Sequence, residues 1–204
     1  TLRPTPELSF MVIRYGTIAG INITASHNPK EYNGYKAYWE DGAQLAPEHA
    51  SVVANERNNF DPLDTDGIAD FDEAVKSGLI TILDEKFDEK YLDEVVATAI
   101  NPDLVSEVAD TLKVVYTPLH GAGYKLVPEV LRRCGLKHLY TVEEQSIPDG
   151  NFPTVAYPNP EFAEAFGVPS VAPQWFPEFS ASPFQDRSDP YPGSFWQIPH
   201  LHAP

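Results

Sequence analysis

The chain has 204 residues, which is enough for one domain with a substantial core or for two smaller domains. Its 30 acidic residues outnumber its 14 basic ones, and the formal net charge is -16. Such a surface repels the phosphates of nucleic acid, so a nucleic-acid-binding function is disfavoured. A sugar phosphate would be repelled as well, unless a local basic pocket and a divalent cation receive it.

The single cysteine, Cys134, excludes an internal disulfide and fits a reducing compartment. No apolar run approaches the length of a membrane span, and the first residues do not resemble a signal peptide. We therefore expect a cytoplasmic protein without membrane partners.

The first 45 residues predict a helix, a strand and a polar loop. Pro6 favours the start of the helix and Gly16 its end, with apolar residues between them at helical spacing. An apolar run over 18–23 predicts the strand. Asn33-Gly34 indicates a β-hairpin, and residues 35–39 alternate like its second strand before a turn at Asp41-Gly42.

The middle of the chain predicts helices and then a βαβ unit. We expect a short helix over 47–58, a solvated acidic loop over 61–73 and an amphipathic helix from 87 to 96. Residues 114–116 read as a buried strand, 117–123 as a loop, 125–133 as a helix and 139–142 as the next strand. This order favours parallel pairing.

These patterns predict an α/β fold with mixed sheets flanked by helices, organised as a partial two-domain fragment with an irregular C-terminal tail. The expected divisions are 1–86, 87–161 and 162–204. The last segment is rich in proline and aromatic residues without a helical or strand period, so it is either a disordered tail or sequence foreign to the preceding fold.

The chemistry is concentrated in residues 24–36, which read Thr-Ala-Ser-His-Asn-Pro-Lys-Glu-Tyr-Asn-Gly-Tyr-Lys. The spacing places the Ser26 hydroxyl at the end of a strand, beside His27, with an amine ten residues later at Lys36. Phosphoryl transfer needs positioning and charge neutralisation more than reactive side chains, and a serine held here can carry a phosphoryl group.

Structural alternatives exist for each candidate residue. Ser26 could be a turn or cap serine, His27 a loop histidine bonded to the backbone, and Lys36 a solvated strand lysine. His120, followed by Gly121 and Gly123, could bind an anion at a helix start or form a tight connection between strand and helix.

Residues 24–36 resemble the phosphoserine signature of the α-D-phosphohexomutases. Several further segments resemble the phosphoglucomutase branch of that family, in the family's order: 2–10, 38–44, 116–123, 148–154 and 158–161. The resemblance covers about residues 1–161, and it implies phosphoryl transfer between the 1- and 6-positions of a hexose through a bisphosphorylated intermediate.

The resemblance also implies roles for individual residues. Ser26 would be the phosphoserine and, through its phosphate, a ligand of Mg²⁺. His27 and Lys36 would be the other catalytic residues, and the phosphate-binding residues would be Thr24, Asn28 and His120. The implied substrate is a phosphosugar, with glucose 1-phosphate and glucose 6-phosphate as the leading candidates. A hexose 1,6-bisphosphate would be the activator. The sequence does not predict the sugar preference.

The sequence departs from the family pattern in one important respect. No segment resembles the family's Asp-Gly-Asp-Gly-Asp-Arg metal loop, and the family-like motifs end at Glu161. We therefore expect the isolated chain to keep the phosphorylatable serine without completing turnover. The alternatives are a non-catalytic chain that binds a phosphosugar or a protein partner, and the product of a broken gene without a natural role.

Overall fold

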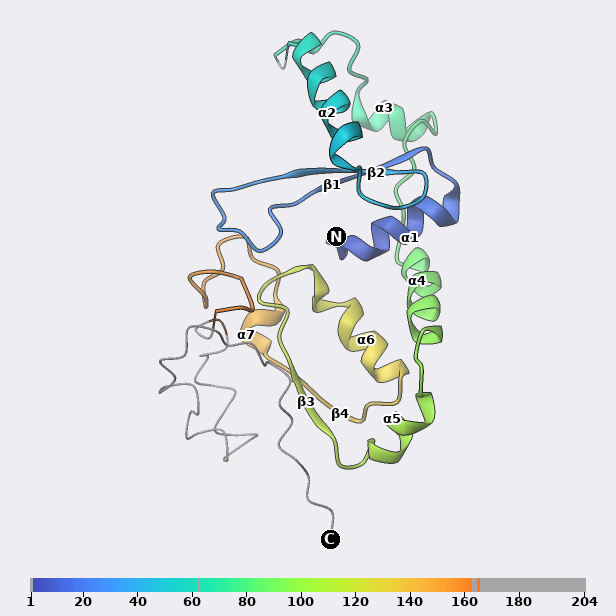
Figure 1. Cartoon of the computed structure of the whole chain (residues 1–204), viewed down its shortest axis with the longest axis vertical. Helices are drawn as coiled ribbons and strands as arrows, with labels where there is room; N and C mark the ends of the chain where they lie inside the picture. The colour runs from blue at the N-terminus through green and yellow to red at the C-terminus, as the bar shows by residue number, and fades with distance from the viewer. Residues whose placement is uncertain (1, 62, 163–164, 166–204) are drawn as a thin grey trace.

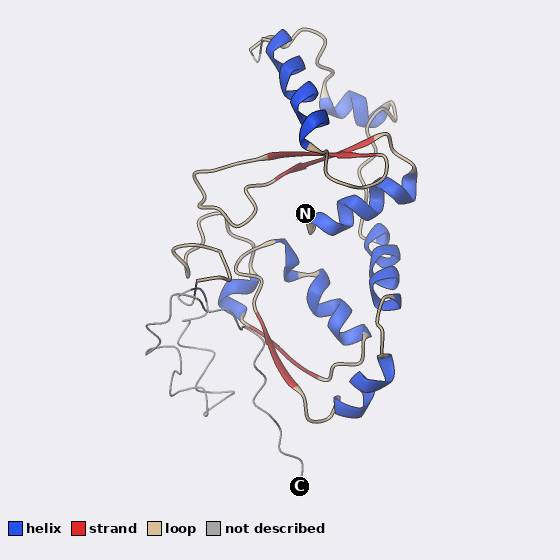
Figure 2. Cartoon of the chain, viewed as in Figure 1, coloured by secondary structure: helices blue, strands red, loops and turns tan. Residues whose placement is uncertain are grey.

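The structure, a computed structural model, describes residues 2–61, 63–162 and 165. Two small sheets flanked by helices form its framework (Figures 1 and 2). The α/β fold with sheets flanked by helices is therefore confirmed, and the two described sheets are one antiparallel pair and one parallel pair. The predicted tail over 162–204 lies outside the described residues apart from Phe162 and Ala165.

The first sheet is an antiparallel pair packed against one helix. Helix α1 (Thr5–Tyr15) has a proline in its first turn and ends at Gly16, whose φ of 60° is left-handed. Strand β1 (Ala19–Ile23) pairs with β2 (Tyr35–Trp39). Gly20 lets α1 approach the sheet, because a Cβ at this position would lie only 2.7 Å from Val12 Cγ2.

The other face of this sheet is largely exposed at β1 in the part of the chain that the structure describes. Alternate residues of β1 point away from α1, and Ile21 and Ile23 are 55% and 60% exposed. The antiparallel pairing is confirmed, but Asn33-Gly34 is not the turn that joins the strands. The strands end at the Ile23–Tyr35 pair, and the whole segment 24–34 forms the connection. A two-residue turn signal fails here because Gly34 is used for a close backbone contact.

Short helices follow the first sheet. The turn at Asp41-Gly42 is confirmed, with a Gly42 φ of 75°. The predicted helix over 47–58 is α2 (Pro47–Glu56), extended by the 3₁₀ turn η1 (Arg57–Asn59). The acidic segment that we expected to be a loop ends in a further helix, α3 (Phe71–Lys76), because the Asp70 carboxylate caps it by accepting the Glu73 N–H at 3.0 Å.

The second sheet confirms the predicted βαβ unit. Strands β3 (Lys113–Tyr116) and β4 (His138–Thr141) pair in parallel, and the connection between them holds η2 (Ala122–Tyr124) and α6 (Leu126–Arg133). The predicted amphipathic helix is α4 (Lys86–Ala97), which lies beside α6 (Figure 1). Besides α3, two further short helices were not predicted, α5 (Pro102–Val108) and α7 (Glu143–Ser146). In the described part of the chain, no helix has the length and apolarity that a bilayer crossing requires.

A buried polar network fixes the loop after β3. Leu119 and His120 have left-handed φ values of 49° and 61°. The His120 N–H donates to the Gln145 carbonyl at 2.8 Å, and the Leu119 N–H donates to Thr117 Oγ1 at 3.0 Å. Gln145, 1% exposed, accepts from the Thr117 hydroxyl at 2.6 Å. The strained loop is held because each of these groups has a defined partner.

The His120 ring completes this network. Its Nδ1 lies 2.9 Å from the Ile147 carbonyl oxygen, and its Nε2 lies 2.8 Å from Thr154 Oγ1. A carbonyl can only accept, so Nδ1 carries the proton, and in the neutral ring Nε2 accepts from the Thr154 hydroxyl. That hydroxyl oxygen in turn accepts from the Gln145 side-chain amide at 3.1 Å. Each ring nitrogen of His120 is therefore engaged in a hydrogen bond within the protein.

Replacing His120 with alanine should destabilise the protein by about 2–4 kcal/mol, since it removes a buried ring that makes two hydrogen bonds. It also removes the edge contact with the Phe152 ring. Urea unfolding measures the loss. The matched control is His138→Ala, whose ring makes one exposed hydrogen bond, to the Asp110 carbonyl. Equal stability of the two variants would contradict a structural role for His120.

Candidate functional site

The connection between β1 and β2 holds most of the residues that the sequence singled out. Ser26 lies on its first turn with an exposed side chain and a φ of 59°. A left-handed conformation costs a non-glycine residue about 1–2 kcal/mol. The turn offsets this cost with local bonds: Thr24 Oγ1 accepts the Ser26 N–H at 2.9 Å, and the Ala25 carbonyl accepts the Asn28 N–H at 3.1 Å. The serine hydroxyl is thus presented to solvent on a defined backbone.

A close backbone contact closes the base of this loop. The Thr24 N–H donates to the Gly34 carbonyl at 3.0 Å. A Cβ on Gly34 would lie 2.4 Å from the Thr24 carbonyl oxygen, which is closer than real Cβ contacts allow. Glycine is therefore required at position 34 for the two ends of the loop to meet. We call this contact the loop neck.

His27 and Asn28 continue the turn, and both are exposed. His27 Nδ1 lies 3.4 Å from Ser26 Oγ, a long contact that either partner could strengthen by a small rotation. An imidazole here can exchange a proton with the serine oxygen or bond to a phosphate on it.

Lys36 lies on β2, two residues after the loop neck. It pairs with Asn22 across the sheet and is half-buried. Asn22 is itself held, because its amide donates to Thr5 Oγ1 on α1 at 2.8 Å. The backbone that carries the Lys36 side chain is therefore fixed by strand pairing and does not belong to the loop. Sequence reasoning missed the contribution of Thr5, Asn22 and Gly34, although the Asn-Gly pair was visible.

His120 makes its hydrogen bonds to residues outside this loop. The family resemblance put it among the phosphate-binding residues, yet it is 3% exposed and both of its ring nitrogens are bonded to residues of the second half of the chain. These bonds favour the alternative interpretation, a tight strand-to-helix connection.

The donor set of this chain does not fit a complete Mg²⁺ site. A phosphate on Ser26 would offer one ligand, and Mg²⁺ is bound by carboxylates and phosphates in octahedral geometry. Within residues 2–61, 63–162 and 165, no three His, Cys, Asp or Glu side chains gather closely enough to hold a metal ion.

The sequence matches two domain models of one family. Residues 1–62 match the α/β/α domain I of phosphoglucomutase/phosphomannomutase, and residues 89–172 match domain II. The second match continues past Glu161, into the segment whose relation to the fold the sequence left open.

Curated relatives of this chain also carry the names of sugar-phosphate mutases. The chain is 41% identical over 165 residues to a phosphoglucomutase of Staphylococcus saprophyticus, covering 80% of the chain and 29% of that protein. It is 38% identical over 175 residues to a phosphoribomutase of Saccharomyces cerevisiae, covering 80% of the chain and 28% of that protein. The chain thus spans less than a third of the length of these curated relatives.

A solved structure shows the same arrangement. The crystal structure of a protein assigned as a phosphomannomutase, from Thermus thermophilus, superposes with a TM-score of 0.61 at 26% identity. The match covers 81% of the chain and 33% of that protein. Two domain matches in order, curated relatives near 40% identity and a shared fold together place this chain in the phosphoglucomutase/phosphomannomutase family, the α-D-phosphohexomutases, on the phosphoglucomutase branch.

Proposed function

We propose that this chain supplies the phosphoserine loop of a phosphohexomutase, with Ser26 as the residue that carries the phosphoryl group. One observation carries the proposal: the Ser26 hydroxyl is exposed on a left-handed turn that Thr24 and the loop neck hold in place. Strained backbone positions concentrate at functional sites, and this one falls inside the matched domain I.

The proposed step moves one phosphoryl group from Ser26 to a sugar hydroxyl. The bond between phosphorus and Ser26 Oγ breaks, and a bond between phosphorus and the sugar oxygen forms. The hydroxyl proton leaves the sugar, and Ser26 Oγ ends as a hydroxyl. His27 is the proposed carrier of this proton, because its Nδ1 faces Ser26 Oγ. The return step runs in reverse with the other phosphoryl group of the bisphosphorylated sugar.

Lys36 is the proposed source of fixed positive charge. The transition state of phosphoryl transfer spreads negative charge over the phosphoryl oxygens, and a held ammonium stabilises it. Thr24 and Asn28 are proposed to shape the phosphate site, Thr24 by orienting the Ser26 backbone. A phosphate on Ser26 would offer one ligand to Mg²⁺, which would supply further charge neutralisation.

The proposed substrates are glucose 1-phosphate and glucose 6-phosphate, with glucose 1,6-bisphosphate as activator. The curated relative with 41% identity is named phosphoglucomutase, which supports glucose, whereas the yeast relative is named phosphoribomutase. The chain spans 29% of the first relative, so turnover is proposed for the assembled enzyme and phosphoserine formation for this chain.

Incubation with glucose 1,6-bisphosphate and Mg²⁺ should add one phosphoryl group to the wild-type chain, and Ser26→Ala should take up none. Intact mass, followed by mass spectrometry of the peptide that contains residues 24–36, measures the uptake. The control is Ser51→Ala, which removes an exposed serine from α2 and should be phosphorylated like the wild type. A wild-type chain without phosphate on Ser26 would favour a non-catalytic binding or interaction module.

Lys36→Met should slow the phosphorylation of Ser26 at least about tenfold, because the transition state loses a fixed positive charge. Lys30→Met is the matched control, since it removes the same charge from an exposed turn of the same loop. A time course of intact mass compares the two rates. Equal rates would contradict a role for Lys36 beyond general attraction of the anion.

A further inference from the structure

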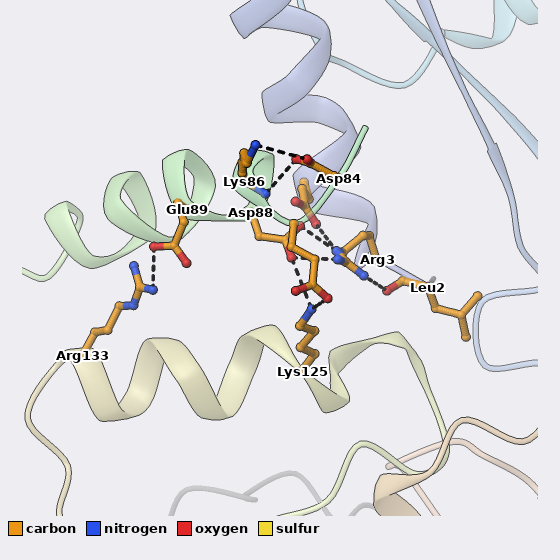
Figure 3. Close-up of polar contacts among 10 residues, drawn as sticks. Leu2, Arg3, Asp84, Lys86, Asp88, Glu89, Lys125 and Arg133 are labelled. Carbon is orange, nitrogen blue, oxygen red and sulfur yellow. Dashed lines mark hydrogen bonds and ion pairs between the residues drawn. The ribbon is translucent and has the colours of Figure 1, made fainter. Parts of the chain in front are cut away.

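A cluster of charged side chains lies where α1, α4 and the segment before α6 meet (Figure 3). Its centre is a bidentate ion pair: Arg3 Nε and Nη2 donate to the two Asp88 carboxylate oxygens, each at 2.7 Å. Lys125 Nζ lies 3.8 Å from the same carboxylate and also pairs with Glu85. Arg3 and Asp88 are 85 positions apart in the sequence, so the pair joins distant segments.

A second carboxyl group is buried beside this pair. Glu7, in the first turn of α1, is 4% exposed, and among the described residues its Oε2 has no hydrogen-bond partner. It forms a long ion pair with Arg3, whose Nε is 3.8 Å away but donates to Asp88 instead. Glu7 thus shares Arg3 with Asp88, which holds that cation more closely. A buried negative charge without a close cation is costly.

The pKa values of the two carboxyl groups shift in opposite directions. Burial, then the negative charge of Asp88, raises the pKa of Glu7 from 4.5 to about 7. Burial also favours the neutral form of Asp88, but the hydrogen bonds and charge of Arg3 outweigh it and lower the pKa of that carboxyl. A protonated Glu7 can donate a hydrogen bond to the ionised Asp88, so one proton serves both groups.

We propose that the Glu7–Asp88 carboxyl pair is a proton-linked joint between the two domains. Arg3 and Glu7 belong to the segment that matches domain I, and Asp88 directly precedes the segment that matches domain II. Two aromatic pairs join the same helices, Phe10 with Tyr91 and Tyr15 with Phe87, at centroid distances of 5.5 and 5.6 Å. With the proton present, α1 packs against α4. When it is lost, two neighbouring anions loosen the contact.

The direction of the pH effect follows from the raised pKa. A carboxyl that binds its proton more tightly in the folded state stabilises the fold at low pH and loses that contribution as the pH rises towards its folded pKa. The window is therefore about pH 4.5 to 7, with the effect lost above it. The pKa of Asp88 is lowered, so this carboxyl titrates at a pH below the window. Its titration therefore does not oppose the pH effect of Glu7. The charged or titratable groups around Glu7, from each neighbouring segment, are Arg3, Asp84, Asp88, Tyr91, Tyr124 and Lys125.

The experiment is thermal unfolding of the 204-residue chain at pH 6 and pH 8. The wild type should unfold about 4 °C higher at pH 6. Glu7→Gln should lose this difference and unfold above the wild type at pH 8, because an amide stays neutral at both pH values. Glu48→Gln, in the first turn of α2 with an exposed side chain, is the matched control and should keep the wild-type difference.

Two further readouts make the test specific. Hydrogen exchange, corrected for intrinsic rates, should show lower protection of residues 5–15 and 86–97 at pH 8 than at pH 6 in the wild type and equal protection in Glu7→Gln. If that variant does not fold, carbon-13 carboxyl spectra of the wild type decide, since one glutamate should titrate near pH 7. The proposal is overturned if every glutamate titrates below about pH 5.5 or if Glu7→Gln keeps the wild-type pH difference.

Discussion

The backbone contact between Thr24 and Gly34 determines where the residues of the candidate site lie. It brings the two ends of the 24–34 loop within hydrogen-bonding distance, and only a residue without a Cβ permits that approach. Because the neck is closed, the first turn of the loop starts from a fixed point, and the Thr24 hydroxyl is placed to accept the Ser26 N–H. The left-handed conformation of Ser26 therefore depends on a contact at the far end of the same loop, made by Gly34.

The neck in turn depends on the sheet beneath it. Helix α1 packs on β1 through Gly20 and is tied to that strand by the bond from Asn22 to Thr5. Lys36 pairs with the same Asn22, so one cross-strand position connects the helix, the strand and the proposed source of positive charge. On its other side, α1 carries Glu7 and the aromatic residues that pack against α4. A single helix thus supports both the loop and the contact with α4, most of which lies in the segment that matches domain II.

The net charge of -16 makes the few basic residues informative. Several of them balance carboxylates where α4 meets its neighbours: Arg3 and Lys125 at Asp88, and Arg133 at Glu89 (Figure 3). Pairs of this kind hold elements in register more than they add stability when they are exposed. Glu7 is the exception, since it is buried and shares its cation with a stronger competitor, and a proton compensates for that deficit.

Local signals in the sequence predicted what local interactions decide. Proline at position 6 and glycine at position 16 marked the ends of α1, and alternation marked β2, because those features act within a few residues. The parallel βαβ unit followed from the order of its elements. The serine, histidine and lysine of the 24–36 segment were identified from the motif and its family resemblance.

What the sequence could not predict depends on contacts between distant residues. Asn33-Gly34 looks like a hairpin turn, yet the glycine serves the neck, and only the position of Thr24 reveals this. His120 looks like a ligand beside a glycine-rich loop, but its partners at 147 and 154 hold it in the fold. Helices α5 and α7 are too short to show a period. The environment of Glu7 depends on Asp88, and no pattern in the sequence around either residue predicts that the two lie together.

The rate at which Ser26 takes up phosphate in Gly34→Ala tests most directly whether the loop neck positions the serine. The added methyl group must displace the Thr24 carbonyl, so the loop neck opens and the serine loses its fixed position. We predict that transfer from glucose 1,6-bisphosphate falls at least about tenfold, while Gly150→Ala, where a Cβ meets nothing within 4 Å, keeps the wild-type rate. An unchanged rate in Gly34→Ala would contradict the central claim that the neck positions the reactive serine.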